Sequence, residues 1–463
     1  MDKHLNYFEV RWKNFKGFKD TKWIKIKPIT ILIGENNSGK TNFIAPFLLM
    51  QQTLTSRDPN SPLIIKGGLY DGGNIQEIVN NYNLENDLFF GLRYHIHEID
   101  YKKLPSLGLY GPGSFEVTLN IKGNEIDGDI LIKKETISDV FNREFFTLTL
   151  TKNDKYKLSG EIDSHLMSEE EKTAIKNSSP INFVFTPDSL LRELMLLKKP
   201  NKEKTIVKRK KGYSKEFSNL LDLMSYNYTR IWGYIGDLSY IGPLRENPHR
   251  VYEVSNESYN TVGPKGENMT NLIRKYFPQR NKDLDFWIKK FGFGDWLELK
   301  KLYGNSYSIR FRDKINPKIF TCIANSGFGA SQILPLIIQA LVAEEESLTI
   351  AEQPEIHLNP KLQCELADLF VYMAKREQKV IIETHSEYLL LRLRKLVAEK
   401  SISSDDIAIY FVKKEEGVSN IKEIKIQEDG HIKDDDWPKD FFEDSLRESL
   451  GLATEQYKSN KPK

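Results

Sequence analysis

The hydrophobic pattern is most continuous near the N-terminus, where Ile29–Ile33 is apolar at almost every position. A run that is apolar on both faces predicts a strand inside a sheet. A Gly-rich segment follows directly, and residues 41–54 then carry apolar side chains at helical spacing. Aromatic and β-branched runs at 7–12 and 23–26 predict two earlier strands. The predicted order is therefore strand, Gly-rich loop, helix.

The rest of the chain has two kinds of pattern. Short alternating segments between 86 and 186 predict antiparallel strands, with helices at 168–176 and 189–198. After residue 239, apolar strands alternate with helical segments, which predicts a parallel α/β sheet. We expect an α/β fold with a mixed sheet around the Gly-rich loop and an α+β insertion. The expected parts are an N-terminal part (1–84), the insertion of antiparallel strands and a helical arm (85–235), a C-terminal part of the same core (236–400), and a β-hairpin and helix extension (401–463).

The Gly-rich segment Gly34-Glu35-Asn36-Asn37-Ser38-Gly39-Lys40-Thr41 has the Walker A spacing. Its backbone N–H groups and the following helix N-terminus suit phosphate, while the lysine reaches the β- and γ-phosphates and the Thr41 hydroxyl suits Mg²⁺. A chance Gly-rich turn is the alternative, but the flanking strand and helix argue against it. The candidate ATP ligands are Gly34, Asn36, Asn37, Ser38, Gly39, Lys40, Thr41 and Asn42.

Polar residues follow two later apolar strands. Glu352, Gln353 and Glu355 come after the strand at 348–351, and His385 follows the strand at 379–382. The carboxyl ends of parallel strands are where Mg²⁺ and phosphates gather, so Glu352 is the candidate second Mg²⁺ ligand. The alternatives are an ordinary solvated strand end and a structural histidine.

A loop of small residues at 325–332 precedes another apolar helix. Its free N–H groups predict an anion site that includes Ser326, Gly327 and Gly329. The alternative is a simple helix cap made by Ser326 or Ser331. One such loop beside one Walker A loop suggests that two copies of the chain pair, each covering the nucleotide of the other.

The charge composition limits how the chain could bind nucleic acid or metal ions. The 67 Lys and Arg balance 65 Asp and Glu, so a nucleic-acid surface would have to be local. The one basic stretch runs from Lys198 to Lys211 and is either a solvated loop or a contact to nucleic-acid phosphates. The acidic run at 434–436 is better explained as a solvated face than as a metal site.

The same composition suggests where the chain works. Two cysteines, Cys322 and Cys364, allow one disulfide but favour a reducing compartment. The first residues lack the apolar core of a secretion signal, and no apolar run is long enough to cross a bilayer. We therefore expect a cytoplasmic protein.

Taken together, these motifs resemble ATPases of the ABC type, in the soluble branch shared with SMC-like and OLD (overcoming lysogenization defect) proteins. The resemblance covers roughly residues 7–55 and 238–450. Its motifs here are FEVRWKNFKGF at 8–18, YIGPLR at 240–245, SGFGASQ at 326–332, EQPEIHLNP at 352–360, ETHS at 383–386, and the tail around 430–442.

This resemblance implies an ATP sandwich between two copies. Lys40 and Thr41 would bind phosphate and Mg²⁺, Glu352 would support Mg²⁺, and Ser326 and Gly327 would cap the γ-phosphate of the opposing copy. His385 would sense that phosphate. The family usually has a glutamate at the position of Gln353, and an amide cannot accept a proton from water. We therefore expect slow ATP hydrolysis, with Glu355 as the possible substitute.

The resemblance also suggests a role as the regulatory ATPase of a bacterial anti-phage system that works with a separately encoded nuclease. The 78 residues after His385 contain no acid constellation of a Toprim nuclease. The alternative is a DNA-repair or chromosome-maintenance ATPase of the SMC-like class, although the long heptad repeats of that class are absent from the sequence. A transporter subunit fits less well, because of the large insertion.

Overall fold

The fold is organised by a six-stranded sheet that carries the Gly-rich loop. The computed structural model describes residues 7–58, 61–94, 113–122, 129–139, 143–197 and 213–433. The strand order is β10-β15-β16-β4-β17-β18, parallel except for the last pair. The strands are β4 (Ile29–Ile33), β10 (Ser239–Ile241), β15 (Leu348–Glu352), β16 (Lys379–Glu383), β17 (Ile407–Glu415) and β18 (Val418–Ile424).

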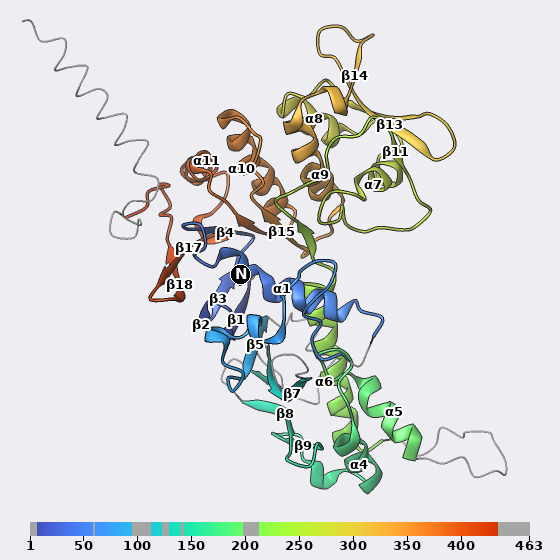
Figure 1. Ribbon diagram of the computed structural model, residues 1–463, viewed down its shortest axis with the longest axis vertical. Coiled ribbons are helices and arrows are strands. Elements are labelled where there is room, and N and C mark those ends of the chain that lie inside the picture. Colours follow the sequence, from blue (N-terminus) through green and yellow to red (C-terminus); the bar gives the residue numbers. More distant parts are fainter. Residues whose placement is uncertain are drawn as a thin grey trace, which may run out of the picture.

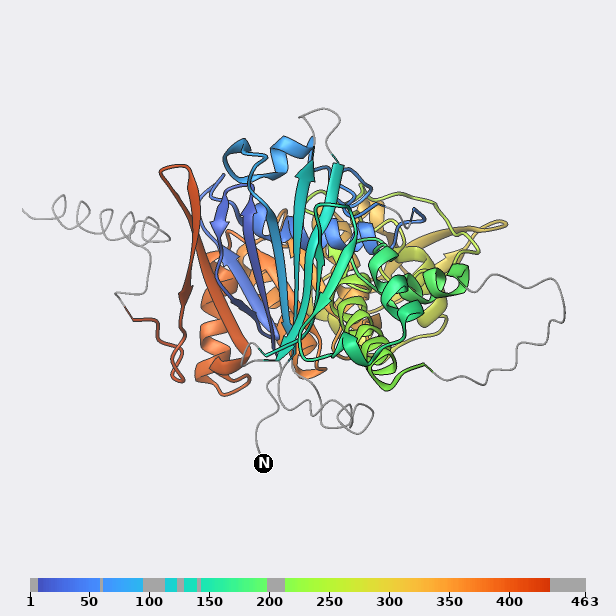
Figure 2. The ribbon, with the colours of Figure 1, turned by 90° about the horizontal axis from the view of Figure 1, so that it is seen from below.

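A larger antiparallel sheet lies on the other side of helix α1 (Lys40–Leu54) (Figure 1). Its eight strands join the N-terminal segment to the insertion, because β5 pairs with β1. Figure 2 shows these strands side by side, with the β17–β18 hairpin standing next to the N-terminal ones. The strands are β1 (Phe8–Phe15), β2 (Phe18–Asp20), β3 (Ile24–Ile26), β5 (Leu88–Tyr94), β6 (Gly113–Lys122), β7 (Asp129–Asp139), β8 (Glu144–Leu150) and β9 (Tyr156–Ser159).

Helix α1 is enclosed by the two sheets. Its residues share one hydrophobic core with Trp12 and Phe90 of the large sheet and with Leu32 of the six-stranded sheet. The Trp12 indole N–H donates to the Phe43 carbonyl at 3.1 Å, which ties the sheet to the helix backbone. The side chains of β4 alternate between two cores: Leu32 faces α1, while Ile31 and Ile33 face the opposite core. The apolar run at Ile29–Ile33 is therefore buried on both faces, as predicted.

Helices cover the opposite face of the six-stranded sheet (Figure 1). A short four-stranded sheet lies beside them. The helices are α7 (Met269–Tyr276), α8 (Lys282–Lys290), α9 (Phe328–Val342), α10 (Pro360–Lys375) and α11 (Glu387–Ala398), and the strands are β11 (Tyr252–Glu253), β12 (Leu297–Lys301), β13 (Ser306–Arg312) and β14 (Phe320–Cys322).

The insertion ends in a helical segment that leads back to the core. Helix α6 (Lys215–Ile231) continues into a π-helical turn at Trp232–Gly236, and β10 follows. The Tyr94 hydroxyl donates to Asn227 at 2.7 Å, so α6 is fixed to the large sheet. The other helical elements are α2 (Ile75–Ile78), α4 (Glu169–Asn177), α5 (Pro187–Leu197), and single 3-10 turns at Asn80–Tyr82, Ser164–Leu166, Ile323–Asn325 and Ser404–Asp406.

The expected fold class is confirmed: a mixed sheet surrounds the Gly-rich loop, and an α+β insertion is present. The four-stranded sheet was not predicted, because its strands β11 and β14 are short or half-exposed and their periodicity is weak. Helix α6 falls within the insertion, where a helical arm was expected without bounds, and it is clearly amphipathic. The domain boundaries stay a prediction, although the β1–β5 pairing continues one sheet across residue 85.

The structure also bears on the expectations about the cysteines, membrane-spanning segments and charged stretches. Both cysteines are free. Within the described ranges, no helix combines the length and apolar content needed to cross a membrane. The basic stretch from Lys198 to Lys211, the acidic run at 434–436 and the helix near 441–450 lie outside the described residues.

The buried Glu135 of β7 gives a pH-dependent prediction. Burial raises its pKa to about 8, and the Phe185 N–H is its one hydrogen-bond donor among the described residues. Because the unfolded carboxyl ionises near its ordinary pKa of 4.5, Glu135 should lower the free energy of unfolding between about pH 4.5 and 8, by up to roughly 1.4 kcal/mol per pH unit. Glu135→Gln should remove this contribution and make the fall in stability smaller, as measured by urea unfolding at pH 5.5 and 8.

The matched control is Glu170→Gln, which changes an exposed glutamate on α4. Its unfolding curves should keep the pH dependence of the unmodified protein. Equal pH dependence in the Glu135→Gln variant and the unmodified protein would contradict the assignment.

Candidate nucleotide-binding site

The Gly-rich loop joins the buried strand β4 to the N-terminus of α1. Lys40 is the first residue of the helix, and its side chain folds back over the loop. Its ammonium donates to the carbonyls of Gly34 at 2.9 Å and Glu35 at 2.8 Å. Asn36 and Asn37 are exposed at the tip of the loop. The loop therefore presents a helix N-terminus and a buried ammonium at one place, which is the arrangement that binds phosphate.

Three carboxylates surround this single ammonium. Burial lowers the pKa of Lys40, and the charges of Glu383, Glu35 and Glu355 oppose that shift. Glu383 and Glu355 are buried, whereas Glu35 is exposed. The buried part of the site is thus short of positive charge. A divalent cation would supply that charge.

Two glutamates are the last residues of neighbouring parallel strands and lie side by side. Glu352 closes β15 and Glu383 closes β16, and they are register partners in the parallel pair. Glu383 accepts a hydrogen bond from the Thr41 hydroxyl at 3.1 Å, and Glu352 accepts one from the Tyr240 hydroxyl at 2.9 Å. Thr41 lies in the first turn of α1, which follows β4, and Glu352 ends β15. Glu383 ends β16, the strand between β15 and β4, and it is hydrogen-bonded to Thr41.

The pKa values of this pair reflect burial and mutual repulsion. Burial, then the charge of Glu383, raise the pKa of Glu352 to about 7, against the Tyr240 hydrogen bond and the charge of Arg245. Burial also raises the pKa of Glu383, against the charge of Lys40 and the Thr41 hydrogen bond. Both carboxylates would be stabilised by a bound cation.

The chain turns sharply after Glu352. Gln353 has a left-handed φ of 44°, and its N–H donates to the Glu383 carbonyl at 2.7 Å. The buried Arg245 guanidinium donates to the Glu352 carbonyl at 2.9 Å and the Gln353 carbonyl at 3.4 Å. Burial lowers the pKa of Arg245 to about 10. Arg245 thus fixes the backbone of Glu352 and Gln353.

The buried Glu355 contacts the half-buried His385. The backbone N–H of His385 donates to Glu355 Oε1 at 2.8 Å. Within the described part of the chain, the buried atoms Glu355 Oε2 and His385 Nε2 have no hydrogen-bond partner. Burial raises the pKa of Glu355, and burial followed by the charge of Lys40 lowers that of His385. Two unsatisfied buried polar atoms near the phosphate loop indicate groups that await a ligand or water.

The small-residue loop lies elsewhere on the chain surface. Helix α9 begins at Phe328, inside the segment 325–332 that was expected to be a loop, so Gly329 lies in its first turn. Neither Ser326 nor Ser331 caps it: the N-cap is Gly327, with φ 84°, and both serine hydroxyls donate to carbonyls of their own segment. The Phe328 ring packs on the ring of His357, which lies between β15 and α10.

The loop is also open to solvent. Gly327 is exposed, Phe328 is 45% exposed, and a side chain at Gly327 would meet no atom within 4 Å. Among the described residues, no hydrogen bond or ring contact joins Ser326, Gly327 or Gly329 to the phosphate loop of the same chain.

Comparison with known protein families shows to which family the chain belongs. A family model described as AAA ATPase domain matches residues 8–390. The chain belongs to the AAA ATPase domain family. In this ATPase a second model, described as Protein of unknown function (DUF3696), matches residues 402–452. No match is found among curated proteins.

Solved structures similar to this ATPase include SMC heads. The SMC head domain from Thermotoga maritima aligns at 13% identity and a TM-score of 0.39, covering 91% of this chain and 99% of that chain. The Smc head domain with an extended coiled coil bound to the C-terminal domain of ScpA, from Pyrococcus furiosus, aligns at 12% identity and a TM-score of 0.38, covering 97% and 99%.

The residues present fit a nucleotide with Mg²⁺. Thr41, Glu352 and Glu383 would hold the ion, which supplies positive charge to the phosphates when bound. Among the described residues, no cluster of three or more His, Cys, Asp or Glu could hold a metal alone. Mg²⁺ usually binds one or two carboxylates together with substrate phosphates.

Sequence reasoning missed three residues of this site: Glu383, Tyr240 and Arg245. Glu383 ends an apolar strand just as Glu352 does, so its position was available as a signal. Tyr240 and Arg245 lie in the recognised segment at 240–245 but had no assigned role. Their positions depend on the pairing of β10 with β15.

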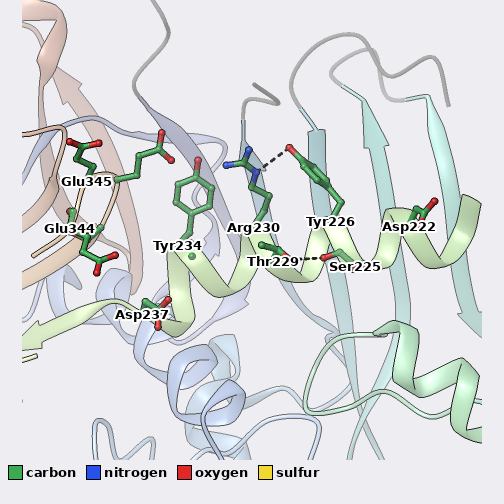
Figure 3. Close-up of a pocket in the computed structure, with 12 residues that line it drawn as sticks. Asp222, Ser225, Tyr226, Thr229, Arg230, Tyr234, Asp237, Glu344 and Glu345 are labelled. Atoms are coloured by element: carbon green, nitrogen blue, oxygen red, sulfur yellow. Dashed lines mark hydrogen bonds between the residues drawn. The ribbon is translucent and has the colours of Figure 1, made fainter. Parts of the chain in front are cut away.

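A separate groove of about 600 Å³ lies between α6 and the loop before β15 (Figure 3). Glu344 and Glu345 face Tyr234 across it, and Arg230 donates to the Tyr226 hydroxyl at 3.1 Å. The groove contains no residue of the phosphate loop and more acids than bases. It would repel a nucleotide, so the phosphate loop remains the nucleotide site.

Replacing Glu383 tests its place in the site. Glu383→Gln should weaken ATP binding in the presence of Mg²⁺ by roughly 10- to 100-fold, because an amide cannot neutralise the ion or hold Thr41 as strongly. Binding without Mg²⁺ should change little. A fluorescent ATP analogue titrated with and without Mg²⁺ measures both values.

Glu35→Gln is the matched control, because Glu35 is an exposed acid near the same ammonium. Its Mg²⁺ dependence should equal that of the unmodified protein. An unchanged Mg²⁺ dependence in Glu383→Gln would count against the role of this carboxylate.

Proposed function

We propose that this chain is a slowly hydrolysing ATPase switch that closes an ATP·Mg²⁺ sandwich between two copies of itself. The observation that carries the proposal is the meeting of Lys40, Thr41, Glu352 and His385 around the ends of β4, β15 and β16, with Gln353 at the usual catalytic position. The ligands for ATP would be the loop residues from Gly34 to Asn42. The family membership supports nucleotide binding.

Slow hydrolysis follows from the groups near the phosphate. Gln353 can orient water but cannot take its proton. Glu355 is a carboxylate near the phosphate loop, and its Oε2 has no hydrogen-bond partner among the described residues. Burial raises its pKa, so its carboxylate is a better proton acceptor than an ordinary glutamate. However, one of its oxygens is committed to the His385 N–H, so it is tied to the sensor segment. ATP would therefore persist long enough to act as a conformational signal.

The sandwich would use the exposed loop at Ser326–Gly327 of the second copy. Helix α9 begins there, so its N-terminus would face the γ-phosphate of the first copy. The exposed Phe328 ring would be covered in the same contact. His385 of the first copy would then sense the γ-phosphate of the ATP bound to that same copy.

The cellular role we propose is regulation of a separately encoded nuclease in bacterial anti-phage defence, in the cytoplasm. It rests on the motif resemblance to OLD-type ATPases. Affinity purification from phage-infected cells, followed by mass spectrometry, tests it. A nuclease recovered from infected cells would support it, and recovery of chromosome-structuring proteins would favour the SMC-like alternative.

The hydrolysis step can be tested by exchanging two side chains. Gln353→Glu should raise ATP turnover by roughly tenfold or more, because it restores a general base, and Glu355→Gln should lower it by a similar factor. Phosphate release by the purified protein measures both. Turnover at many ATP per second, unchanged by Gln353→Ala, would contradict the slow switch.

The sandwich has its own test. Ser326→Arg should abolish ATP-dependent dimers while leaving ATP binding by the monomer intact, because the added side chain occupies the contact without touching the phosphate loop. Light scattering after size exclusion, with and without ATP·Mg²⁺, measures the mass. Ser225→Arg on the exposed side of α6 is the control. Equal dimer formation by Ser326→Arg would exclude this interface.

A further inference from the structure

The β17–β18 hairpin touches the back of the phosphate loop. The Ser419 hydroxyl on β18 donates to the Ser38 carbonyl at 2.7 Å. The Ser419 N–H donates to the Gly17 carbonyl at 2.8 Å, and Ser419 is 3% exposed. The hairpin follows the switch histidine in sequence and lies in the segment matched by the second family model. A C-terminal element is therefore in direct contact with the nucleotide loop.

The contact leaves no spare room. A Cβ added at Gly17 or at Gly39 would lie 2.5 Å from Ser419 Oγ. Gly39 also has φ +113°, which few other residues adopt. Position 419 thus takes a small side chain with a hydrogen-bond donor. A serine meets both needs, whereas a larger side chain would push the loop.

The hydrogen bond sets the direction of one amide in the loop. The Ser38 carbonyl and the Gly39 N–H belong to one planar trans peptide, so they point in opposite directions. Since Ser419 holds the carbonyl toward the hairpin, the Gly39 N–H is held toward the other side, away from β18. That amide is one of those expected to bind phosphate in a Walker A loop.

We infer that Ser419 is a positioning residue for the phosphate loop, and that it links the C-terminal hairpin to ATP binding. The inference rests on the proposed nucleotide site and names a regulation of that site. Strand β17 pairs with β4 in parallel, so the hairpin is also attached to the strand that leads into the loop. Coupling of this kind is reciprocal: if the hairpin orders the loop for ATP, then ATP orders the hairpin.

The first test is Ser419→Ala in the full chain. Losing one buried hydrogen bond should raise the KM for ATP about fivefold and leave kcat nearly unchanged, because the bond orients a binding amide and touches no reacting atom. Exchange of the Gly39 amide with deuterium should become faster in the same variant. Asn420→Ala, at the exposed neighbouring position, is the control and should match the unmodified protein.

The second test needs no variant. Addition of ATP·Mg²⁺ to the unmodified protein should slow hydrogen exchange across 417–421, measured by mass spectrometry. An unchanged KM in Ser419→Ala, or hairpin exchange that ignores ATP, would overturn the inference. Failure of the unmodified protein to bind ATP at all would instead overturn the proposed function.

Discussion

The enclosure of helix α1 between two sheets is the constraint on which the rest of the structure depends. Almost the whole helix is buried, from Lys40 to its last turn. A helix with no exposed face cannot rotate or slide without breaking both cores. Its N-terminus is therefore fixed at the edge where β4, β15 and β16 end, and the acids of those strands are brought to it.

Because the helix and strands are fixed, several carboxyl groups are held close together in a buried place, which is electrostatically unfavourable. Glu352, Glu355 and Glu383 are buried close to the ends of β15 and β16, and burial raises the pKa of all three. A fourth acid at position 353 would add to the repulsion. The neutral Gln353 avoids that repulsion and so favours the folded chain. Under the proposed function, the same neutral side chain would also account for slow hydrolysis.

The sequence was informative where a residue's environment is set by its neighbours along the chain. The buried strand β4 and the start of α1 follow from local pattern, and so do the acidic ends of β15 and β16. The hydrogen bonds that Tyr240 and Arg245 make with Glu352 could not be predicted, because they depend on β10 lying next to β15. The two-residue strand β11 and the half-exposed β14 gave no usable periodicity.

The pairing of β1 with β5 has a consequence for anyone who wishes to shorten the protein. The insertion looks removable in sequence, since the motifs lie on either side of it. In the fold, however, β5 supplies the hydrogen-bond partners along β1 from Glu9 to Lys13. Cutting out 85–235 would leave that backbone as an open strand edge beside the aromatic core around Trp12. Such an edge recruits other chains, so a minimal version would need a replacement strand to stay in solution.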